Sequence, residues 1–320
     1  MKTIGLLTSG GDSSGMNAAI RSAVQKASIL GIRVIGFIQG YQGLIENNYK
    51  DLDMTAVEGI VQKGGTVLRS ARCLEFKSDW GQKTALENID KAGIEGMLVI
   101  GGDGSLHGAQ VLHDLGVPVL GLPASIDNDI YGTDMAIGVD TALNVIVRAV
   151  DSLRDTASSH DRAFILEVMG RSSGYLAFTS AIACAAEALI IPEVPYNLEE
   201  IGNRLLEAKK RGKTNSIVIV AEGAVSAFAV EMKMKSFAGF ETRITVLGHL
   251  QRGGDPTVFD RLLATRLASS AVRRLAEGER GSMVGWIKNE IVATPFTEVF
   301  AHKKVLDDKS LAIARELAGA

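Results

Sequence analysis

The chain has 320 residues, of which 46% are hydrophobic and 22% charged, a composition typical of a folded globular protein. Its formal net charge of −3 excludes a general attraction to nucleic acid or to an anionic membrane, so any anion must be bound by local groups of side chains. The two cysteines, Cys73 and Cys184, lack metal-ligand and disulfide-framework spacing, which favours a reducing compartment. The N-terminal apolar run is too short for a secretory signal, and the long apolar stretch at 177–191 is interrupted by Glu187. We therefore expect a cytoplasmic protein with no nucleic-acid or membrane partner.

Short, nearly continuous apolar runs recur along the chain, as expected for strands that are buried on both faces of a parallel sheet. They lie at Thr3–Thr8, Arg33–Ile38, Met97–Ile100, Val117–Leu122, Ala163–Val168 and Ile217–Ala221. Apolar residues also recur at helical spacing, at Met16, Ile20, Val24 and Ala27 and at Ala142, Ile146, Ala149 and Leu153. This alternation predicts a doubly wound, mostly parallel α/β fold, and the chain is long enough for two such lobes.

Glycine-rich turns follow the predicted strands, at the sheet edge where ligands of such folds bind. The first is Ser9-Gly10-Gly11-Asp12, which leads into a helix. Adjacent glycines let the backbone approach an anion closely, and the helix start offers unpaired N–H groups. The turn matches neither a Walker loop nor a dinucleotide fingerprint, and a plain strand-to-helix turn is the alternative.

The second turn, Gly101-Gly102-Asp103-Gly104-Ser105, places a carboxylate among glycines, with a helix expected to begin at about Ser105. A carboxylate beside a phosphate cradle would repel the phosphates unless a metal ion lay between them. Mg²⁺ suits this position because it takes oxygen ligands and keeps several waters. The alternative is that Asp103 only caps the helix, and we favour metal–nucleotide binding.

The third turn is Pro123-Ala124-Ser125-Ile126-Asp127-Asn128-Asp129. Two carboxylates one residue apart are costly unless they share a proton, a metal ion or cationic partners. One of them can act as a base for a substrate hydroxyl while the other orients or coordinates. Taken alone, an Asx-rich surface turn is equally plausible. Three acid-bearing turns after three strands favour a shared site.

The later part of the chain supplies positive charge near further strand ends. Arginines at such positions suit bidentate recognition of phosphate, although any one of them could be a solvated surface charge. These candidate residues are Arg162, the segment Met169-Gly170-Arg171, Glu222, Arg243 and the basic loop Gly248-His249-Leu250-Gln251-Arg252-Gly253-Gly254.

Taken together, these motifs resemble those of bacterial 6-phosphofructokinases, in order from about residue 1 to about residue 290. The resemblance implies transfer of the γ-phosphoryl group of MgATP to the 1-hydroxyl of fructose 6-phosphate. Asp127 would take the hydroxyl proton, Asp129 would organise the charge, and Arg72 and Arg171 would compensate negative charge during transfer. The active site would lie in a cleft between a nucleotide lobe, residues 1–138 plus 251–301, and a sugar-phosphate lobe, residues 139–250 plus 302–320.

The resemblance also implies binding roles, with Asp103 as the Mg²⁺ ligand. The nucleotide would be held by Gly11, Arg72, Cys73, Gly102, Asp103, Gly104 and Ser105. The sugar phosphate would be held by Ser125, Asp127, Arg162, Met169, Gly170, Arg171, Glu222, Arg243, His249 and Arg252. In this family Arg162 and Arg243 reach in from a neighbouring subunit, so we expect a homotetramer.

Small residues favour ATP as the donor. Pyrophosphate-dependent relatives carry a bulky acid where Gly104 stands and a lysine where Ala124 stands. The chain departs from the family pattern at Ser13 and Ser14, which replace Ala-Pro, and at Cys73, which replaces an aromatic residue. Leu74, Ser125 and Asp255 also depart from the pattern, and the role of the tail after Ala301 is open.

The family's effector pocket binds ADP as an activator and phosphoenolpyruvate as an inhibitor. Its matching residues here are Arg21, Arg154, Glu187, Arg211 and Lys213, whereas neutral residues replace expected cations at Gln25, Met54 and Asn215. Removing positive charges should weaken anion binding, so we expect weak or altered allosteric control. Three alternatives stay open: a pyrophosphate-dependent enzyme, an NAD or lipid kinase, and a non-catalytic nucleotide-sensing homologue.

Overall fold

The computed structural model describes residues 1–158, 163–213, 215–237 and 241–319. The chain forms two compact units, and each is assembled from separate stretches of sequence. The first unit comprises Met1–Ser125, Ile130–Thr141 and Arg252–Lys304, and the second comprises Ile126–Asp129, Ala142–Gln251 and Val305–Ala320. Among the described residues, no helix is both long and apolar enough to cross a membrane.

The first unit is built on a seven-stranded sheet with the order β11-β10-β5-β4-β1-β2-β3. All neighbouring strands are parallel except at the two edges, where β3 and β11 run antiparallel to their neighbours. The strands are β1 (Thr3–Ser9), β2 (Arg33–Phe37), β3 (Tyr49–Leu52), β4 (Gly96–Gly101), β5 (Val119–Pro123), β10 (Ser282–Ile287) and β11 (Glu290–Pro295). The predicted mostly parallel α/β class is confirmed.

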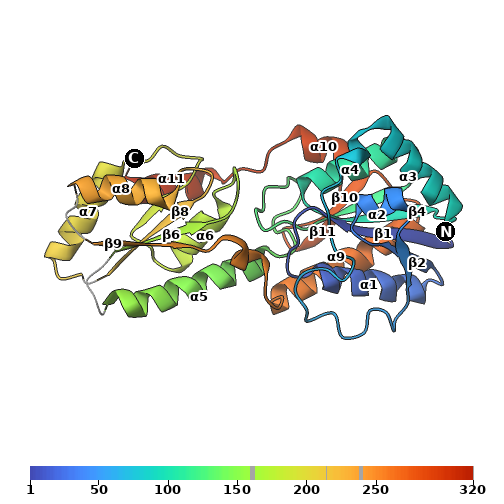
Figure 1. Cartoon of the computed structure of the whole chain (residues 1–320), viewed down its shortest axis with the longest axis horizontal. Coiled ribbons are helices and arrows are strands. Elements are labelled where there is room, and N and C mark those ends of the chain that lie inside the picture. The colour runs from blue at the N-terminus through green and yellow to red at the C-terminus, as the bar shows by residue number, and fades with distance from the viewer. Residues whose placement is uncertain (159–162, 214, 238–240, 320) are drawn as a thin grey trace. The chain divides into compact units, whose positions relative to one another are not determined.

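Helices cover both faces of this sheet (Figure 1). On one face α1 (Met16–Ile29) packs against α9 (Val258–Ala276), and alanines such as Ala23 and Ala268 let the two helices approach closely. The other face buries residues of α2 (Tyr41–Glu46), α3 (Asp79–Lys91), α4 (Asp103–Asp114) and α10 (Phe296–Ala301), with the short helix η1 (Glu75–Lys77). Burial on both faces explains why the central strands are almost wholly apolar.

The second unit contains a four-stranded, fully parallel sheet with the order β7-β8-β6-β9. Its strands are β6 (Ala163–Val168), β7 (Ala188–Ile190), β8 (Ser216–Ala221) and β9 (Thr242–Val246). Residues of α7 (Leu198–Lys210) and α8 (Ala227–Phe237) form one hydrophobic core with this sheet. The other elements are α6 (Tyr175–Ala183), η2 (Gly248–Arg252), α11 (Asp308–Ala318) and α5 (Val139–Ser158), which begins in the first unit.

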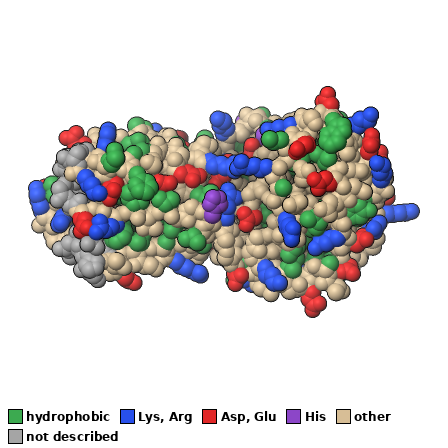
Figure 2. All heavy atoms as spheres, in the orientation of Figure 1, with side chains coloured by type: hydrophobic (Ala, Val, Ile, Leu, Met, Phe, Trp, Pro, Cys, Tyr) green, Lys and Arg blue, Asp and Glu red, His purple; other side chains and the backbone are tan. Residues whose placement is uncertain are grey.

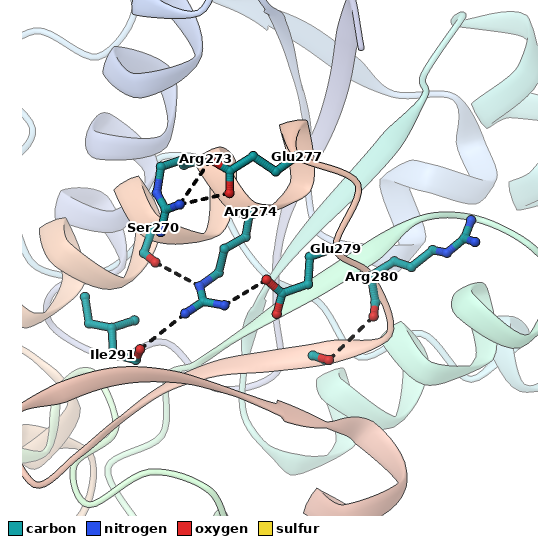
Figure 3. A network of polar contacts seen from close by, with 8 residues as sticks. Ser270, Arg273, Arg274, Glu277, Glu279, Arg280 and Ile291 are labelled. Carbon is teal, nitrogen blue, oxygen red and sulfur yellow. Dashed lines mark hydrogen bonds and ion pairs between the residues drawn. The ribbon is translucent and has the colours of Figure 1, made fainter.

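A polar network joins the end of α9 to the β10–β11 hairpin (Figure 3). The Arg274 guanidinium pairs with Glu279 at 2.8 Å and donates to the Ser270 hydroxyl at 3.2 Å and the Ile291 carbonyl at 3.3 Å. The three partners lie in α9, in the segment between α9 and β10, and in β11, so together they hold the guanidinium between the helix and the hairpin. It therefore ties the helix to the antiparallel edge of the sheet.

A second buried anchor, Asp260 in the first turn of α9, holds the start of α5. One carboxylate oxygen accepts the Gly138 N–H at 2.9 Å, and the other accepts the Thr141 N–H at 2.8 Å and its hydroxyl at 2.5 Å. These are donors that a helix start leaves unpaired. Burial nevertheless raises the pKa of the Asp260 carboxyl to about 6, with the nearby Asp140 charge adding to the rise.

This raised pKa predicts a pH-dependent stability. The folded state keeps the Asp260 proton up to about pH 6, whereas the unfolded chain loses it near 3.8, so stability should fall as pH rises through this window. The loss amounts to about 3 kcal/mol by linkage. Denaturant unfolding of wild type and Asp260→Asn at pH 4 and pH 7 checks this. We expect the difference in the free energy of unfolding between wild type and variant to shrink toward pH 7, and an unchanged difference would contradict the raised pKa of Asp260.

Candidate active site

The three glycine- and acid-bearing turns begin at one edge of the first sheet. Strand β4 lies between β1 and β5, and all three run in the same direction. Ser9 is in register with Gly101, and Gly101 is in register with Pro123. The segments that follow these residues therefore leave the sheet side by side, at its carboxyl edge, which is where ligands of such sheets bind.

The turn after β1 is held by residues from distant parts of the chain. The Ser70 hydroxyl donates to the Gly10 carbonyl. The guanidinium of Arg252 lies directly over Gly11, where an added side-chain carbon would be only 1.8 Å from its Nη1 atom. The same nitrogen donates to the Asp12 carbonyl at 3.4 Å. A bare glycine is therefore required for the arginine to lie across this turn.

The turn after β4 runs straight into α4, which begins at Asp103, two residues earlier than predicted. Gly102 takes an extended conformation and serves as the N-cap, so Asp103 occupies the first helical turn, where its charge meets the positive end of the helix dipole. Its carboxylate lies 3.5 Å from Nδ1 of His107, whose ring stacks on Phe300. The Asp103 side chain is mostly exposed and stands at the sheet edge.

Space is open at the second residue of this helix. A side-chain carbon added at Gly104 would meet no atom within 4 Å, whereas Ala124 is buried in the hydrophobic core of the first unit. Of the two small residues, Gly104 therefore leaves open space beside this turn, and Ala124 fills part of the core. Ser125 lies near this turn, since a carbon added at Gly102 would be 3.6 Å from its Cβ.

Tyr41 supports the α4 turn from inside the protein, a role that the sequence did not indicate. Its hydroxyl donates to the Ser105 carbonyl at 2.7 Å, and its ring stacks on Phe76. Burial raises the pKa of Tyr41 well above its ordinary value, so the hydroxyl keeps its proton and remains a donor. The absence of a side chain at Gly108 makes room for the ring.

The remaining predicted nucleotide residues lie on the loop before η1. Arg72 is exposed, and Cys73 is half-buried against the core that contains α3 and α4. Burial raises the pKa of the Cys73 thiol, which therefore stays neutral beside Glu75. This thiol has no aromatic face to offer a nucleobase.

The carboxylates of the structure can be compared with the predicted Mg²⁺ site at Asp103. Among the described residues, no group of three or more His, Cys, Asp or Glu side chains could hold a metal ion by itself. A single exposed carboxylate, Asp103, fits Mg²⁺, which is commonly bound by one or two carboxylates together with substrate phosphates and water. The residues therefore fit a metal that arrives with its nucleotide.

In the second unit, Asp127 is buried and faces an exposed cation. Its carboxylate lies 3.5 Å from Nε of Arg171, and the two side chains are 5% and 63% exposed. Asn128 between the two acids adopts a left-handed conformation with φ of 49°, which asparagine tolerates better than most residues. The buried carboxylate is thus paired with the positive charge of a long side chain that faces solvent.

Arg171 is positioned through its backbone. Its N–H donates to the Glu222 carboxylate at 3.0 Å, so Glu222 at the end of β8 orients the turn after β6. The N–H of the preceding Met169 donates to Gln251 at 3.2 Å, and the Gln251 amide donates to the Gly248 carbonyl at 3.0 Å. Gln251, to which the sequence assigned no role, therefore links the basic loop to the Met169–Arg171 turn.

Two other predicted substrate residues take no part in these contacts. Arg243 is exposed and pairs with Glu241, and His249 is exposed on η2. Arg162 lies outside the described residues. On the face drawn in Figure 2, Lys and Arg side chains are interspersed with Asp and Glu over each unit, which agrees with the small net charge.

Of the predicted effector residues in the second unit, Arg154, Glu187 and Lys213 are already bound to one another, and Arg211 is exposed after the end of α7. Glu187 pairs with Lys213 at 2.5 Å and with Arg154 at 3.7 Å, and it also accepts the Ile217 N–H at 2.5 Å. Arg154 donates to the side chain of Asn215 at 3.2 Å. An incoming anion would have to compete with Glu187 for both cations. In the first unit, Arg21 donates to Gln25 at 3.2 Å.

Comparison with known proteins accounts for this arrangement. A phosphofructokinase family model matches residues 3–275. The chain belongs to the phosphofructokinase family. An ATP-dependent 6-phosphofructokinase of Thermotoga neapolitana is 50% identical over 99% of this chain and 100% of its own length. Proteins of the same name from Halalkalibacterium halodurans and Clostridioides difficile are 50% and 48% identical over similar spans.

Solved structures of this family have the same fold. The phosphofructokinase of Pichia pastoris superposes with a TM-score of 0.90 at 35% identity, over 99% of this chain, which spans 36% of that longer chain. A pyrophosphate-dependent phosphofructokinase of Marinobacter aquaeolei reaches a TM-score of 0.84 at 20% identity. The second likeness shows the fold alone.

The buried support of the α4 turn can be tested by Tyr41→Phe. Losing the hydroxyl removes its hydrogen bond to the Ser105 carbonyl, so the free energy of unfolding should fall by about 0.5–1.5 kcal/mol. Denaturant unfolding measures the change, and Tyr49→Phe, at a partly exposed ring, is the matched control. Equal effects of the two substitutions would show that the Tyr41 hydroxyl contributes nothing.

Proposed function

We propose that this chain transfers the γ-phosphoryl group of MgATP to the 1-hydroxyl of fructose 6-phosphate, giving fructose 1,6-bisphosphate and ADP. The observation that carries the proposal is sequence identity of 50%, over 99% of this chain, with bacterial proteins named ATP-dependent 6-phosphofructokinase. The retained acids and arginines support catalysis over a non-catalytic, nucleotide-sensing role. An NAD or lipid kinase would not account for the family match over residues 3–275.

In this reaction the acceptor oxygen forms a bond to the γ-phosphorus while the bond to the β-phosphate oxygen breaks. Asp127 takes the hydroxyl proton, and the Arg171 guanidinium, 3.5 Å away, supplies positive charge beside its carboxylate. Arg72 and Arg171 offset negative charge around the moving group, and Asp129 orients the acceptor. Phosphoryl transfer depends mainly on such alignment and charge neutralisation.

The nucleotide is bound by the first unit in this proposal. Backbone N–H groups near Gly11 and at the start of α4, from Gly102 through Gly104, face its phosphates, with Ser105, Arg72 and Cys73 beside it. Asp103 would hold the Mg²⁺, which would supply positive charge to offset that of the phosphates. Residues 1–138 plus 251–301 form this nucleotide lobe, and residues 139–250 plus 302–320 form the acceptor lobe.

The acceptor is bound by Met169, Gly170, Glu222 and His249 of the second unit, and by Ser125 and Arg252, which belong to the first unit. Arg243, exposed on an edge strand, and Arg162 would serve the site of a neighbouring subunit in a homotetramer. Sedimentation of the active enzyme tests this assembly, because full activity in a monomer would contradict it. We expect this reaction to take place in the cytoplasm.

The base assignment is tested with Asp127→Asn. Removing a positioned base should lower kcat by about 10²–10⁴-fold while KM for both substrates changes little. A coupled assay with fructose 6-phosphate and ATP measures both constants. Asp114→Asn, at the exposed far end of α4, is the control. Near-normal turnover of the Asp127 variant would rule out the base.

The donor assignment is tested at Gly104. Gly104→Asp adds a charged side chain in open space, so folding should be unchanged while KM for ATP rises at least about tenfold. The same assay with pyrophosphate in place of ATP decides between the two donors. Better wild-type turnover with pyrophosphate than with ATP would overturn the proposal.

The paired effector residues predict weak regulation. Phosphoenolpyruvate must displace Glu187 from Lys213 and Arg154, and three expected cations are neutral here. We therefore expect activity at sub-millimolar phosphoenolpyruvate to fall by less than about twofold, with ADP a weak activator. Glu187→Gln should strengthen inhibition by freeing both cations. Steep cooperative inhibition of wild type would contradict this expectation.

A further inference from the structure

Two adjacent serines in the turn after β1 have hydroxyls in opposite situations. Both side chains are buried, Ser13 at 0% and Ser14 at 2% exposure. The Ser14 hydroxyl donates to the Gly254 carbonyl at 2.7 Å, and it also lies 3.5 Å from the Arg252 carbonyl. The Ser13 hydroxyl has no hydrogen-bond partner within the described part of the chain. One hydroxyl thus joins two loops that are distant in sequence, and the other does not.

The acceptor of this bond belongs to the loop that carries Arg252. Gly254 takes a left-handed conformation with φ of 90°, two residues after the arginine. Its carbonyl is also approached by Gly64, where an added side-chain carbon would lie 2.3 Å from that oxygen. The loop at 63–67 is in turn held by Asn17, which donates to the Lys63 carbonyl at 3.0 Å and accepts the Val67 N–H at 2.8 Å.

The position of the Arg252 guanidinium depends on this clamp. It lies over Gly11 and donates to the Asp12 carbonyl, so both ends of the arginine, its backbone and its charged group, contact the turn that contains Ser14. A drift of the backbone at 252–254 would carry the guanidinium away from this turn. All of these residues belong to the first unit.

We propose that Ser14 is a positioning residue for Arg252, which acts through the hydrogen bond to Gly254. The inference rests on the proposed function, in which Arg252 contacts a substrate phosphate. Ser14 stands where the family usually has proline. A proline would restrict the backbone of the turn, whereas the Ser14 hydroxyl ties the turn directly to the basic loop. Small displacements of charged binding groups are costly, because phosphate binding depends on their alignment.

The experiment compares Ser14→Ala with Ser13→Ala, two one-atom deletions at neighbouring buried positions. Steady-state constants are measured for ATP and fructose 6-phosphate in wild type, in both variants and in Arg252→Gln. Arg252→Gln identifies the substrate whose KM depends on Arg252. Ser14→Ala should raise the KM for that same substrate by about two- to tenfold, the scale of one hydrogen bond. Its kcat should stay within about twofold, and Ser13→Ala should leave both constants unchanged.

A double variant isolates the route through Arg252. In the Arg252→Gln background, Ser14→Ala should cause no further rise in that KM, since the group it positions is gone. Gly64→Ala, which presses on the Gly254 carbonyl from the other side, should raise the same KM and serves if Ser14→Ala folds poorly. Additive effects of Ser14→Ala and Arg252→Gln, or equal effects of the two serine variants, would overturn the inference.

A readout that needs no activity separates this inference from the proposed function. Hydrogen exchange at 252–257 in the intact enzyme should be faster in Ser14→Ala than in wild type, and unchanged in Ser13→Ala. If wild type fails to phosphorylate fructose 6-phosphate, the proposed function fails while the exchange comparison still tests the clamp. Unchanged exchange in Ser14→Ala would show that the bond does not hold the loop.

Discussion

The parallel pairing of β1, β4 and β5 is the constraint on which the candidate site depends. Because the three strands are neighbours and point the same way, the turns after Ser9, Gly101 and Pro123 leave the sheet at one edge. Antiparallel pairing would send alternate turns to opposite edges. The apolar strands β1 and β4 thus place Gly10, Gly11 and Asp103 in one region of the first unit without contributing any chemistry themselves.

Fixed side chains around this edge convert a set of loops into a defined surface. Tyr41 supports the α4 turn from the core, Asp260 anchors the start of α5, and Ser14 ties the first turn to the basic loop. Asp260 and Ser14 satisfy backbone groups that a helix start or a turn leaves unpaired, and such groups are costly to leave without a partner in a buried setting. Preorganisation of this kind matters most for phosphoryl transfer, where the protein aligns charges and does little covalent chemistry.

The second unit shows the same division between anchors and chemistry. Asp127 is buried and Arg171 is exposed, so the acid is shielded while its cation can move toward a substrate. Glu222 holds the backbone N–H of Arg171, and Gln251 holds that of Met169, two residues earlier. In contrast, the acid of the predicted effector cluster, Glu187, satisfies the cations that would attract an anion. Both places contain acid–arginine pairs. We expect the exposed Arg171 to serve a substrate, and we expect Arg154 and Lys213, which already pair with Glu187, to bind an anion weakly.

The sequence by itself determined the fold class and the central strands, and it predicted the residues proposed to carry the chemistry, because strand burial and glycine-rich turns leave local patterns. It also indicated Asp103, Asp127 and Arg171 through their positions after strands. Only the tertiary structure placed Arg252 over Gly11, separated the roles of Ser13 and Ser14, and revealed Tyr41 and Gln251 as supports. These contacts join segments far apart in the chain, so no local pattern records them, and their energies depend on burial that only the folded protein creates.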